Sequence, residues 1–194
     1  MKKYGITKQD ALLLVIDAQE RLCSAMDQAL LGRMLHQTGL LCLYAKKEGL
    51  PVILTEQYSK GLGKTIPSLQ KHLDGIPYDY FDKVSFGCAG DGPFMKTLTE
   101  KYPDKKIIIT GMETHVCVYL TALGLIEKGF SVLVAQDAVI SRGREYHQNG
   151  LQLMDRLGAV ITNTESLVFQ LMQCAGGDTF KAVSGYIKEN GLKA

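Results

Sequence analysis

Several residue types and patterns are scarce in this chain, and each scarcity excludes a class of protein. The 194 residues contain no tryptophan and only five prolines, and 46% of them are hydrophobic and 22% charged. These proportions are ordinary for a globular protein and exclude collagen-like and disordered chains. No run of like charge exceeds two residues and the net charge is +2. Nothing therefore indicates nucleic acid or an anionic membrane as a partner.

Paired cysteines and long apolar segments are also missing. The five cysteines are Cys23, Cys42, Cys88, Cys117 and Cys174. An odd number without CxxC spacing argues against a disulfide framework or a zinc knuckle, and free thiols fit a reducing compartment. The apolar run at residues 11–16 is too short to cross a membrane, and no signal-peptide cleavage pattern follows it. We therefore expect a cytoplasmic protein.

Short apolar runs alternate with stretches of helical periodicity along the whole chain. The apolar runs lie at residues 11–16, 51–55, 106–110, 131–135 and 159–162, with a weaker one at 78–81. Runs without polar alternation are typical of strands buried on both faces of a parallel sheet. The helical stretches lie at residues 28–48, 91–102, 115–128, 144–157, 164–174 and 178–188. This alternation predicts a Rossmann-like α/β fold, a three-layer αβα sandwich around an open, mostly parallel six-stranded sheet.

No repeat or change of composition marks a linker, so residues 1–194 are expected to form a single domain. The least regular stretch, residues 56–83, is rich in glycine and proline and is the natural place for an active-site loop. Within it, residues 61–65 resemble the tail of a phosphate-binding loop. The required first glycine is absent, and Pro67 is expected to interrupt the helix that should follow.

Three reactive residue types stand where predicted strands end, which is the edge at which open parallel sheets bind ligands. Asp17 directly follows the first apolar run and is either a catalytic carboxylate or the cap of a turn. Cys117 lies in the first turn of the helix after the fourth strand, where the positive helix end would lower the pKa of a thiol and hold an oxyanion. Lys83 is by itself most simply a solvated charge. Beside a thiol and a carboxylate, however, it would stabilise both anions.

These three positions together resemble the Asp-Lys-Cys triad of the isochorismatase-like cysteine hydrolases. The matching motifs are IDAQ at residues 16–19, FDK at 81–83 and GMETHVCV at 111–118, and the similarity extends over nearly the whole chain. Within this family the chain looks most like the isochorismatase domain-containing proteins, through TEQY at residues 55–58 and KGLG at 60–63.

The resemblance implies a hydrolase that cleaves an amide-type C–N bond of a small molecule through a thioester on Cys117. By the same match Asp17 moves the protons and Lys83 holds the charged arrangement. The backbone N–H groups of Glu113 and Cys117 would form the oxyanion hole, beside a cis peptide at Met112–Glu113. Family members commonly form closed assemblies, so a homo-oligomer is expected. The alternative is a non-catalytic or redox-active thiol protein on the same fold.

Loops around the strand ends supply the expected walls of the substrate pocket. The candidates are Gln19, Tyr58, Phe86 and His115, although His115 could equally serve in packing. Their aromatic character suggests a small, partly flat acyl group.

Two further expectations concern residues beyond the proposed triad. Nicotinamidases carry an aspartate and two histidines as metal ligands after the second strand, whereas this chain has no histidine at residues 52–71. We therefore predict no metal and no cofactor. Asp137 and Arg142, near the end of the fifth apolar segment, are expected to form a structural pair that ties the following loop.

Overall fold

A sheet of six parallel strands forms the centre of the computed structural model, which describes residues 5–190. In chain order the strands are β1 (Ala11–Ile16), β2 (Val52–Gln57), β3 (Tyr78–Lys83), β4 (Lys106–Met112), β5 (Val132–Ile140) and β6 (Val160–Thr162). In space they follow the order β3-β2-β1-β4-β5-β6, and every neighbouring pair is parallel. The predicted open six-stranded sheet is confirmed.

Burial explains which strands gave a strong sequence signal. All six side chains of β1 are buried, as are six of the seven in β4. A strand covered on both faces has no reason to alternate polar and apolar residues. The edge strand β3 is different, because only Lys83 among its six residues is buried. Its polar positions account for the weak apolar run.

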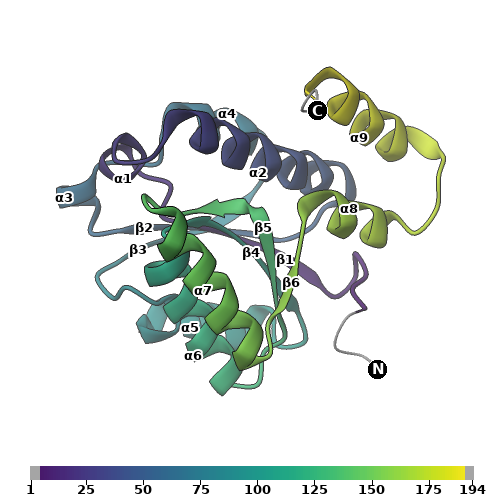
Figure 1. The fold of residues 1–194 in the computed structure, drawn as a ribbon. Helices are drawn as coiled ribbons and strands as arrows, with labels where there is room; N and C mark the ends of the chain where they lie inside the picture. The colour runs from purple at the N-terminus through teal and green to yellow at the C-terminus, as the bar shows by residue number, and fades with distance from the viewer. Residues whose placement is uncertain (1–4, 191–194) are drawn as a thin grey trace.

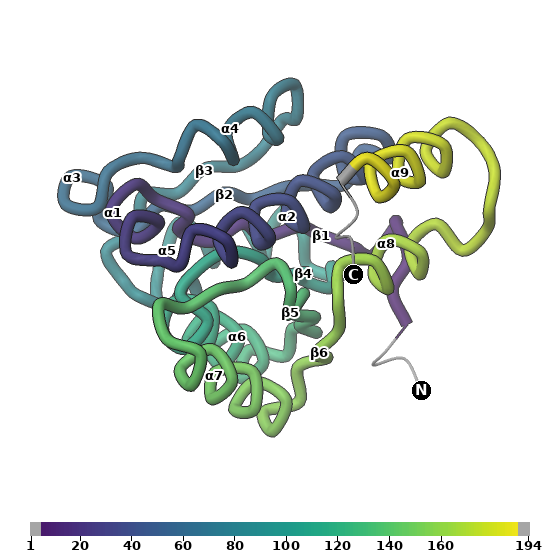
Figure 2. The backbone as a smooth tube through the Cα atoms, turned by 45° about the horizontal axis from the view of Figure 1, so that its top comes forward, coloured from purple at the N-terminus to yellow at the C-terminus, as the bar shows by residue number. Residues whose placement is uncertain are grey.

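Helices cover both faces of the sheet (Figure 1), which confirms the three-layer sandwich. One layer contains α2 (Gln28–Glu48), α4 (Pro67–Leu73), α8 (Thr164–Met172) and α9 (Gly177–Asn190). The opposite layer contains α5 (Gly92–Lys101), α6 (Tyr119–Glu127) and α7 (Arg144–Leu157). Each layer encloses an apolar core against the sheet. Two short helices, α1 (Glu20–Ser24) and α3 (Ser59–Leu62), lie together beyond the carboxyl ends of β1 and β2 (Figures 1 and 2).

Residues 56–83 are more regular than the sequence suggested. Pro67 begins α4 instead of interrupting a helix, because the first turn needs no N–H donor and the proline ring already has a helical φ. The buried Glu56 carboxylate ties this segment to the end of β2. It accepts hydrogen bonds from the backbone N–H and the hydroxyl of Thr65, at 2.7 and 2.9 Å.

Strand β5 shifts its register against β4 near the carboxyl edge. Ile109 pairs with Val134, but Gly111 pairs with Val139. Gly111 has a φ of +113°, and a Cβ atom on it would lie 2.0 Å from the carbonyl oxygen of Ile16. Glycine is therefore required for β4 to lie this close to the end of β1.

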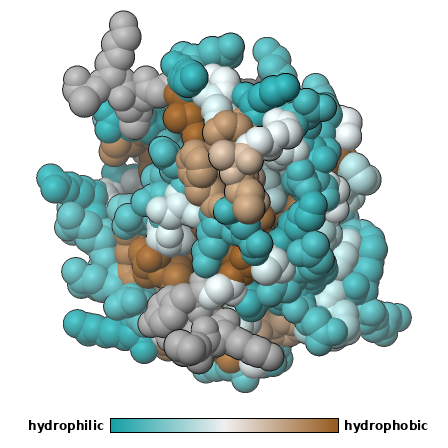
Figure 3. Space-filling view, turned by 90° about the vertical axis from the view of Figure 1, so that its right-hand side faces the viewer, coloured by the Kyte–Doolittle hydropathy of each residue, from teal (hydrophilic) through white to brown (hydrophobic). Residues whose placement is uncertain are grey.

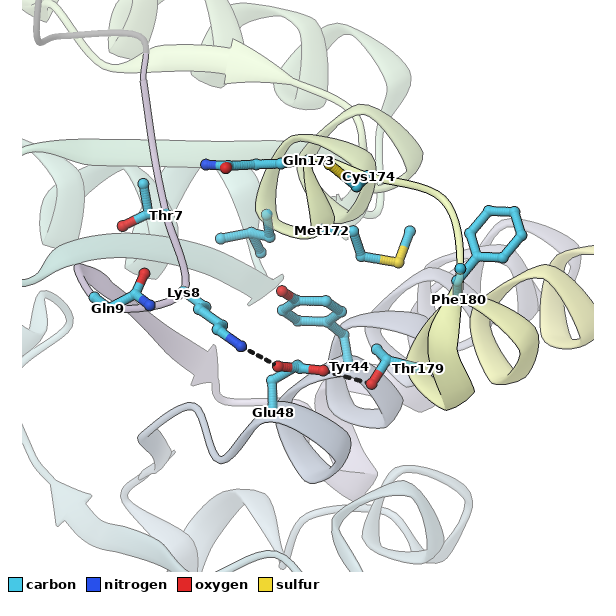
Figure 4. Close-up of a pocket in the computed structure, with 12 residues that line it drawn as sticks. Thr7, Lys8, Gln9, Tyr44, Glu48, Met172, Gln173, Cys174, Thr179 and Phe180 are labelled. Atoms are coloured by element: carbon cyan, nitrogen blue, oxygen red, sulfur yellow. Dashed lines mark hydrogen bonds and ion pairs between the residues drawn. The ribbon is translucent and has the colours of Figure 1, made fainter.

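The C-terminal helix α9 packs on α2. At the end of α2, Glu48 pairs with Lys8 at 2.7 Å and accepts a hydrogen bond from the Thr179 hydroxyl at the start of α9 (Figure 4). These residues line a small hollow of about 200 Å³ together with Tyr44 and Cys174. The face on this side of the molecule is mainly hydrophilic, with patches of hydrophobic side chains between (Figure 3). Within residues 5–190, no helix combines the length and apolarity needed to cross a membrane.

Candidate active site

Asp17 and Lys83 form a buried ion pair at the carboxyl edge of the sheet. Asp17 directly follows β1, and its φ of 49° is a left-handed conformation that turns the backbone away from the strand direction. Its Oδ2 atom lies 2.6 Å from Nζ of Lys83, and both side chains are fully buried. Its Oδ1 atom accepts a hydrogen bond of 2.7 Å from the Thr55 hydroxyl. Both carboxylate oxygens therefore have a partner, as a buried charge requires.

The Lys83 ammonium has no N–H left for a substrate. Besides Asp17, it donates to the carbonyl oxygens of Ser85 and Phe86, at 3.2 and 3.0 Å. An ammonium has three donors, so these contacts use all of them. Lys83 can therefore act on the reaction only through its charge and its hold on Asp17.

Cys117 lies in a single π-helical turn, η2 (Thr114–Val118), which joins β4 to α6. Its side chain is 6% exposed, and the thiol interacts electrostatically with the Asp17 carboxylate. Burial, and then the negative charge of Asp17, raise the pKa of the thiol, although Lys83 opposes them. The expectation that a helix start would lower this pKa is wrong. In this position desolvation and a facing carboxylate outweigh the helix end.

The site contains two acids, Asp17 and Cys117, and one cation, Lys83, whose positive charge can balance only one anion. Burial raises the pKa of Asp17, against the effects of Lys83 and Thr55. Burial alone would lower the pKa of Lys83, but the charge of Asp17 and the nearby thiols raise it. Ionising Cys117 while Asp17 stays charged would place two anions side by side in a region of low dielectric. The arrangement therefore favours a neutral thiol that gives up its proton only to Asp17.

Two residues of this site received no functional role from the sequence. Thr55 lies near the end of β2, directly opposite Ile16 in the sheet. Cys88 is fully buried, its backbone N–H donates to the Thr121 hydroxyl at 2.9 Å, and its thiol interacts with Lys83 and Thr55. Burial raises the pKa of the Cys88 thiol to about 12. The position of Thr55 at a neighbouring strand end was the available signal for that residue. Cys88 offered none.

Glu113 begins the segment that leads to Cys117. The peptide bond between Met112 and Glu113 is cis. The Glu113 carboxylate accepts hydrogen bonds from the backbone N–H and the guanidinium of Arg142, at 3.0 and 2.8 Å.

The expected Asp137–Arg142 pair is therefore wrong. Because β5 continues to Ile140, Asp137 lies within the strand, where it accepts hydrogen bonds from Thr164 at the start of α8.

Gln19 holds a loop together instead of facing a ligand. Its side chain is fully buried, and its Nε2 atom donates to the carbonyl oxygens of Gln57 and Gly63 at 3.1 and 2.7 Å. Its Oε1 atom accepts from the Gln57 N–H at 2.7 Å. The expected substrate contact is corrected to a structural link, because both ends of the amide are occupied by backbone groups.

Tyr58 and Phe86 lie on an exposed rim next to the buried pair. Their exposed fractions are 54% and 58%, and the adjacent Val84 is 78% exposed. The Tyr58 N–H donates to the carbonyl oxygen of Lys83 at 2.8 Å, and the Phe86 carbonyl accepts from the Lys83 ammonium. We call Tyr58, Val84 and Phe86 the apolar rim.

His115 packs against neighbouring elements. Its Nδ1 atom lies 3.0 Å from the Ser141 hydroxyl, and its ring stacks on Tyr146 of α7 at a centroid distance of 4.8 Å. The sequence left substrate contact and packing open for His115, and these two contacts favour packing. Across the part of the chain that the structure describes, no three His, Cys, Asp or Glu side chains are grouped to hold a metal ion.

A parallel α/β sheet that gathers a cysteine, an aspartate and a lysine at its carboxyl edge has the architecture of the hydrolases that the sequence motifs resemble. The family model of the isochorismatase domain matches residues 11–166, and the chain belongs to this family of hydrolases.

Similar proteins cover nearly the whole chain. It is 36% identical over 192 residues to the secreted isochorismatase effector Isc1 of Phytophthora sojae. The match covers 97% of this chain and 90% of Isc1. The solved structure of MAR1 ribonuclease from Caenorhabditis elegans is 31% identical, with a TM-score of 0.85 and coverage of 98% and 97%. YcaC from Pseudomonas aeruginosa, solved with hexane-2,5-diol and covalent acrylamide, is 26% identical, with a TM-score of 0.82 and coverage of 94% and 91%.

Proposed function

We propose that this protein is a cysteine hydrolase that cleaves an amide-type C–N bond of a small molecule through a thioester on Cys117. The observation that carries the proposal is the buried Cys117 thiol beside the Asp17 carboxylate, which is held by a lysine whose three N–H groups all have partners. A thiol with a raised pKa needs an adjacent base to become a nucleophile. The covalent acrylamide in the YcaC structure supports a nucleophilic group on this fold, because acrylamide adds nucleophiles at its alkene carbon.

In the first half-reaction, the Cys117 sulfur attacks the carbonyl carbon while Asp17 takes the thiol proton. The S–C bond forms as the carbonyl π electrons move to oxygen. Collapse of this tetrahedral oxyanion breaks the C–N bond, and Asp17 returns the proton to the leaving nitrogen. The Lys83 charge keeps Asp17 ionised before the attack, and its hydrogen bond to Oδ2 holds the carboxylate in place, while its bonds to the carbonyl oxygens of Ser85 and Phe86 fix the ammonium.

In the second half-reaction, water hydrolyses the thioester. Asp17 takes a proton from the water as the water oxygen attacks the acyl carbon. Collapse of the second oxyanion then breaks the C–S bond. The departing sulfur recovers the proton from Asp17, and a carboxylic acid leaves. No cofactor or metal takes part in these steps.

The backbone N–H groups of Glu113 and Cys117 are the proposed donors to both oxyanions. The Glu113 side chain supports this role, because its carboxylate is paired with Arg142 at 2.8 Å. An unpaired carboxylate next to a developing oxyanion would raise the energy of the transition state.

The apolar rim supports two further parts of the proposal. Tyr58 and Phe86 supply flat apolar surface for a small acyl group, and the exposed fraction of Val84 is large for a monomer surface. We propose that the chain forms a homo-oligomer in which another copy covers the rim. We propose a single domain spanning residues 1–194, because the longer helices within residues 5–190 all pack on the two faces of one six-stranded sheet. Five unpaired cysteines support a cytoplasmic location.

Two other activities make different predictions. A redox-sensing thiol needs a low pKa, whereas burial and Asp17 raise that of Cys117. The MAR1 neighbour is named a ribonuclease, so RNA is the second substrate class to test.

The deciding experiment compares the wild type with Cys117→Ala, using Cys174→Ala as the matched control because Cys174 is exposed and lies outside the site. Ammonia release from a panel of small primary amides and intact mass after acrylamide treatment are measured. Cys117→Ala should lose roughly a thousandfold or more of the turnover and the acrylamide adduct on residue 117. Cys174→Ala should keep the turnover and lose only the adduct of its own exposed thiol. Native turnover in Cys117→Ala, or RNA cleavage without any amide hydrolysis, would overturn the proposal.

A further inference from the structure

A second cavity lies at the carboxyl end of β5, between the first part of α2 and the start of α7. Its volume is about 600 Å³, which is within the range of sites for small organic ligands. None of Asp17, Lys83 and Cys117 lines it. It is therefore separate from the candidate active site.

The walls of this cavity combine apolar side chains with arginines. The apolar members are Leu30, Met34, Val139 and Ile140, and the cationic members are Arg33, Arg142 and Arg144. Two aspartates also line it, and both are engaged elsewhere: Asp27 accepts from the N–H of Leu30, and Asp137 accepts from Thr164. Both aspartates keep their negative charge, but their Oδ1 atoms are directed at these backbone N–H groups.

Two of the arginines are free to bind an anion. Arg142 already pairs with Glu113, whereas Arg33 and Arg144 form no ion pair with any of residues 5–190. A guanidinium binds a carboxylate with two parallel hydrogen bonds. Two such groups above an apolar floor match a ligand that has one carboxylate and an apolar body.

Residues of this cavity also hold the segment that precedes Cys117. Arg142 binds Glu113, and His147 and Ser141 contact Thr114 and His115, each at 3.0 Å. Three consecutive residues of the nucleophile segment are thus attached to cavity residues by side-chain contacts.

We infer that this cavity binds a small amphipathic carboxylate and that its occupation changes the reactivity of Cys117 through residues 113–115. The carboxylate binds Arg33 and Arg144, and the apolar body lies on Leu30, Met34 and Ile140. A ligand that draws Arg142 or His147 toward it changes the hold on Glu113 and Thr114. The inference needs only a reactive thiol, so it can be tested whether or not amide hydrolysis is the activity.

The first test measures binding of 4-phenylbutyrate by calorimetry, with uncharged 4-phenylbutanol as the ligand control. Arg33→Gln and Arg144→Gln should each weaken binding about tenfold, which corresponds to about 1.4 kcal/mol. Arg156→Gln is the matched variant, because Arg156 lies in the last turn of α7 outside the cavity. It should bind as the wild type does. Equal affinity for the alcohol, or an equal loss in all three variants, would overturn the inference.

The second test measures alkylation of Cys117 by iodoacetamide, followed by peptide mass spectrometry, with and without saturating 4-phenylbutyrate. The rate should change about fivefold or more in the wild type and in Arg156→Gln, and Arg33→Gln should need about ten times more 4-phenylbutyrate for the same change. Binding without a change of rate would refute the coupling. Absence of binding, together with protection of the cavity walls from hydrogen exchange on self-association, would instead identify the cavity as an interface between copies.

Discussion

Gly150 places helix α7 directly against the π-helical turn that carries Cys117, and adding one methyl group there tests this contact. A Cβ atom on Gly150 would lie 2.8 Å from the carbonyl oxygen of Thr114, 2.9 Å from its carbonyl carbon and 3.0 Å from Cα of His115. All three are backbone atoms, so no flexible side chain can move aside. Gly150→Ala must therefore push α7 and η2 apart.

The expected free energies can be worked out by comparison with Gly32→Ala in α2. A Cβ atom on Gly32 meets nothing within 4 Å. Glycine-to-alanine replacement inside a helix stabilises a protein by about 1 kcal/mol, so Gly32→Ala should gain roughly this amount. Gly150→Ala gains the same propensity term but loses about 1–3 kcal/mol to the overlap. The two variants should therefore differ by about 1–3 kcal/mol in free energy of unfolding.

Guanidinium denaturation of the wild type and both variants measures this difference, and alkylation of Cys117 provides a second readout. Gly150→Ala should also change the alkylation rate, because η2 carries the thiol, whereas Gly32→Ala should leave it unchanged. If Gly150→Ala is stabilised as much as Gly32→Ala, then α7 does not press on η2 and the reasoning fails.

Two further predictions concern the buried ion pair. Lys83→Met should cost about 3–5 kcal/mol of stability at neutral pH, because the Asp17 charge stays buried without its partner. The deficit should shrink as the pH falls and Asp17 takes up a proton, and denaturation of Lys83→Met with and without Asp17→Asn at several pH values measures it. An equal deficit at all pH values would contradict this assignment. Because burial raises the pKa of Asp17, kcat/KM should fall with decreasing pH at values above the ordinary 3.8 of an aspartate. In Asp17→Asn this acid limb should vanish along with most of the activity; a limb that persists would belong to another group.

Three of the patterned segments were predictable from the sequence to the residue. The bounds of β1, α2 and α7 coincide with the predicted ranges 11–16, 28–48 and 144–157. Their formation depends on local apolar periodicity, which the sequence displays directly. The short helices α1, α3 and α4 were not predicted. Helices of this length are stabilised by tertiary contacts, such as the link from Gln19 to Gly63, which no local pattern reveals.

The three reactive residues of the site could be found because parallel strands bring their carboxyl ends to one edge. Thr55 also lies at a strand end, but a threonine in a strand has no distinctive chemistry in the sequence. Cys88 could not be found, since a small buried cysteine is an ordinary core residue. The pKa of Cys117 was predicted in the wrong direction for a related reason. Position in a helix is visible in the sequence, whereas 6% exposure and a facing carboxylate emerge only on folding.

The raised pKa of Cys117 also accounts for the use of all three groups in the proposed mechanism. A thiol activated by a helix end alone would be a thiolate at rest, open to oxidants and alkylating agents. In this site the thiol stays neutral until an electrophile is bound, because Asp17 already holds the one negative charge that Lys83 can balance. In the proposed attack at a carbonyl, the negative charge moves from Asp17 to the oxyanion as the proton moves to Asp17. The total charge of the site then stays constant throughout the step, which a buried environment of low dielectric strongly favours.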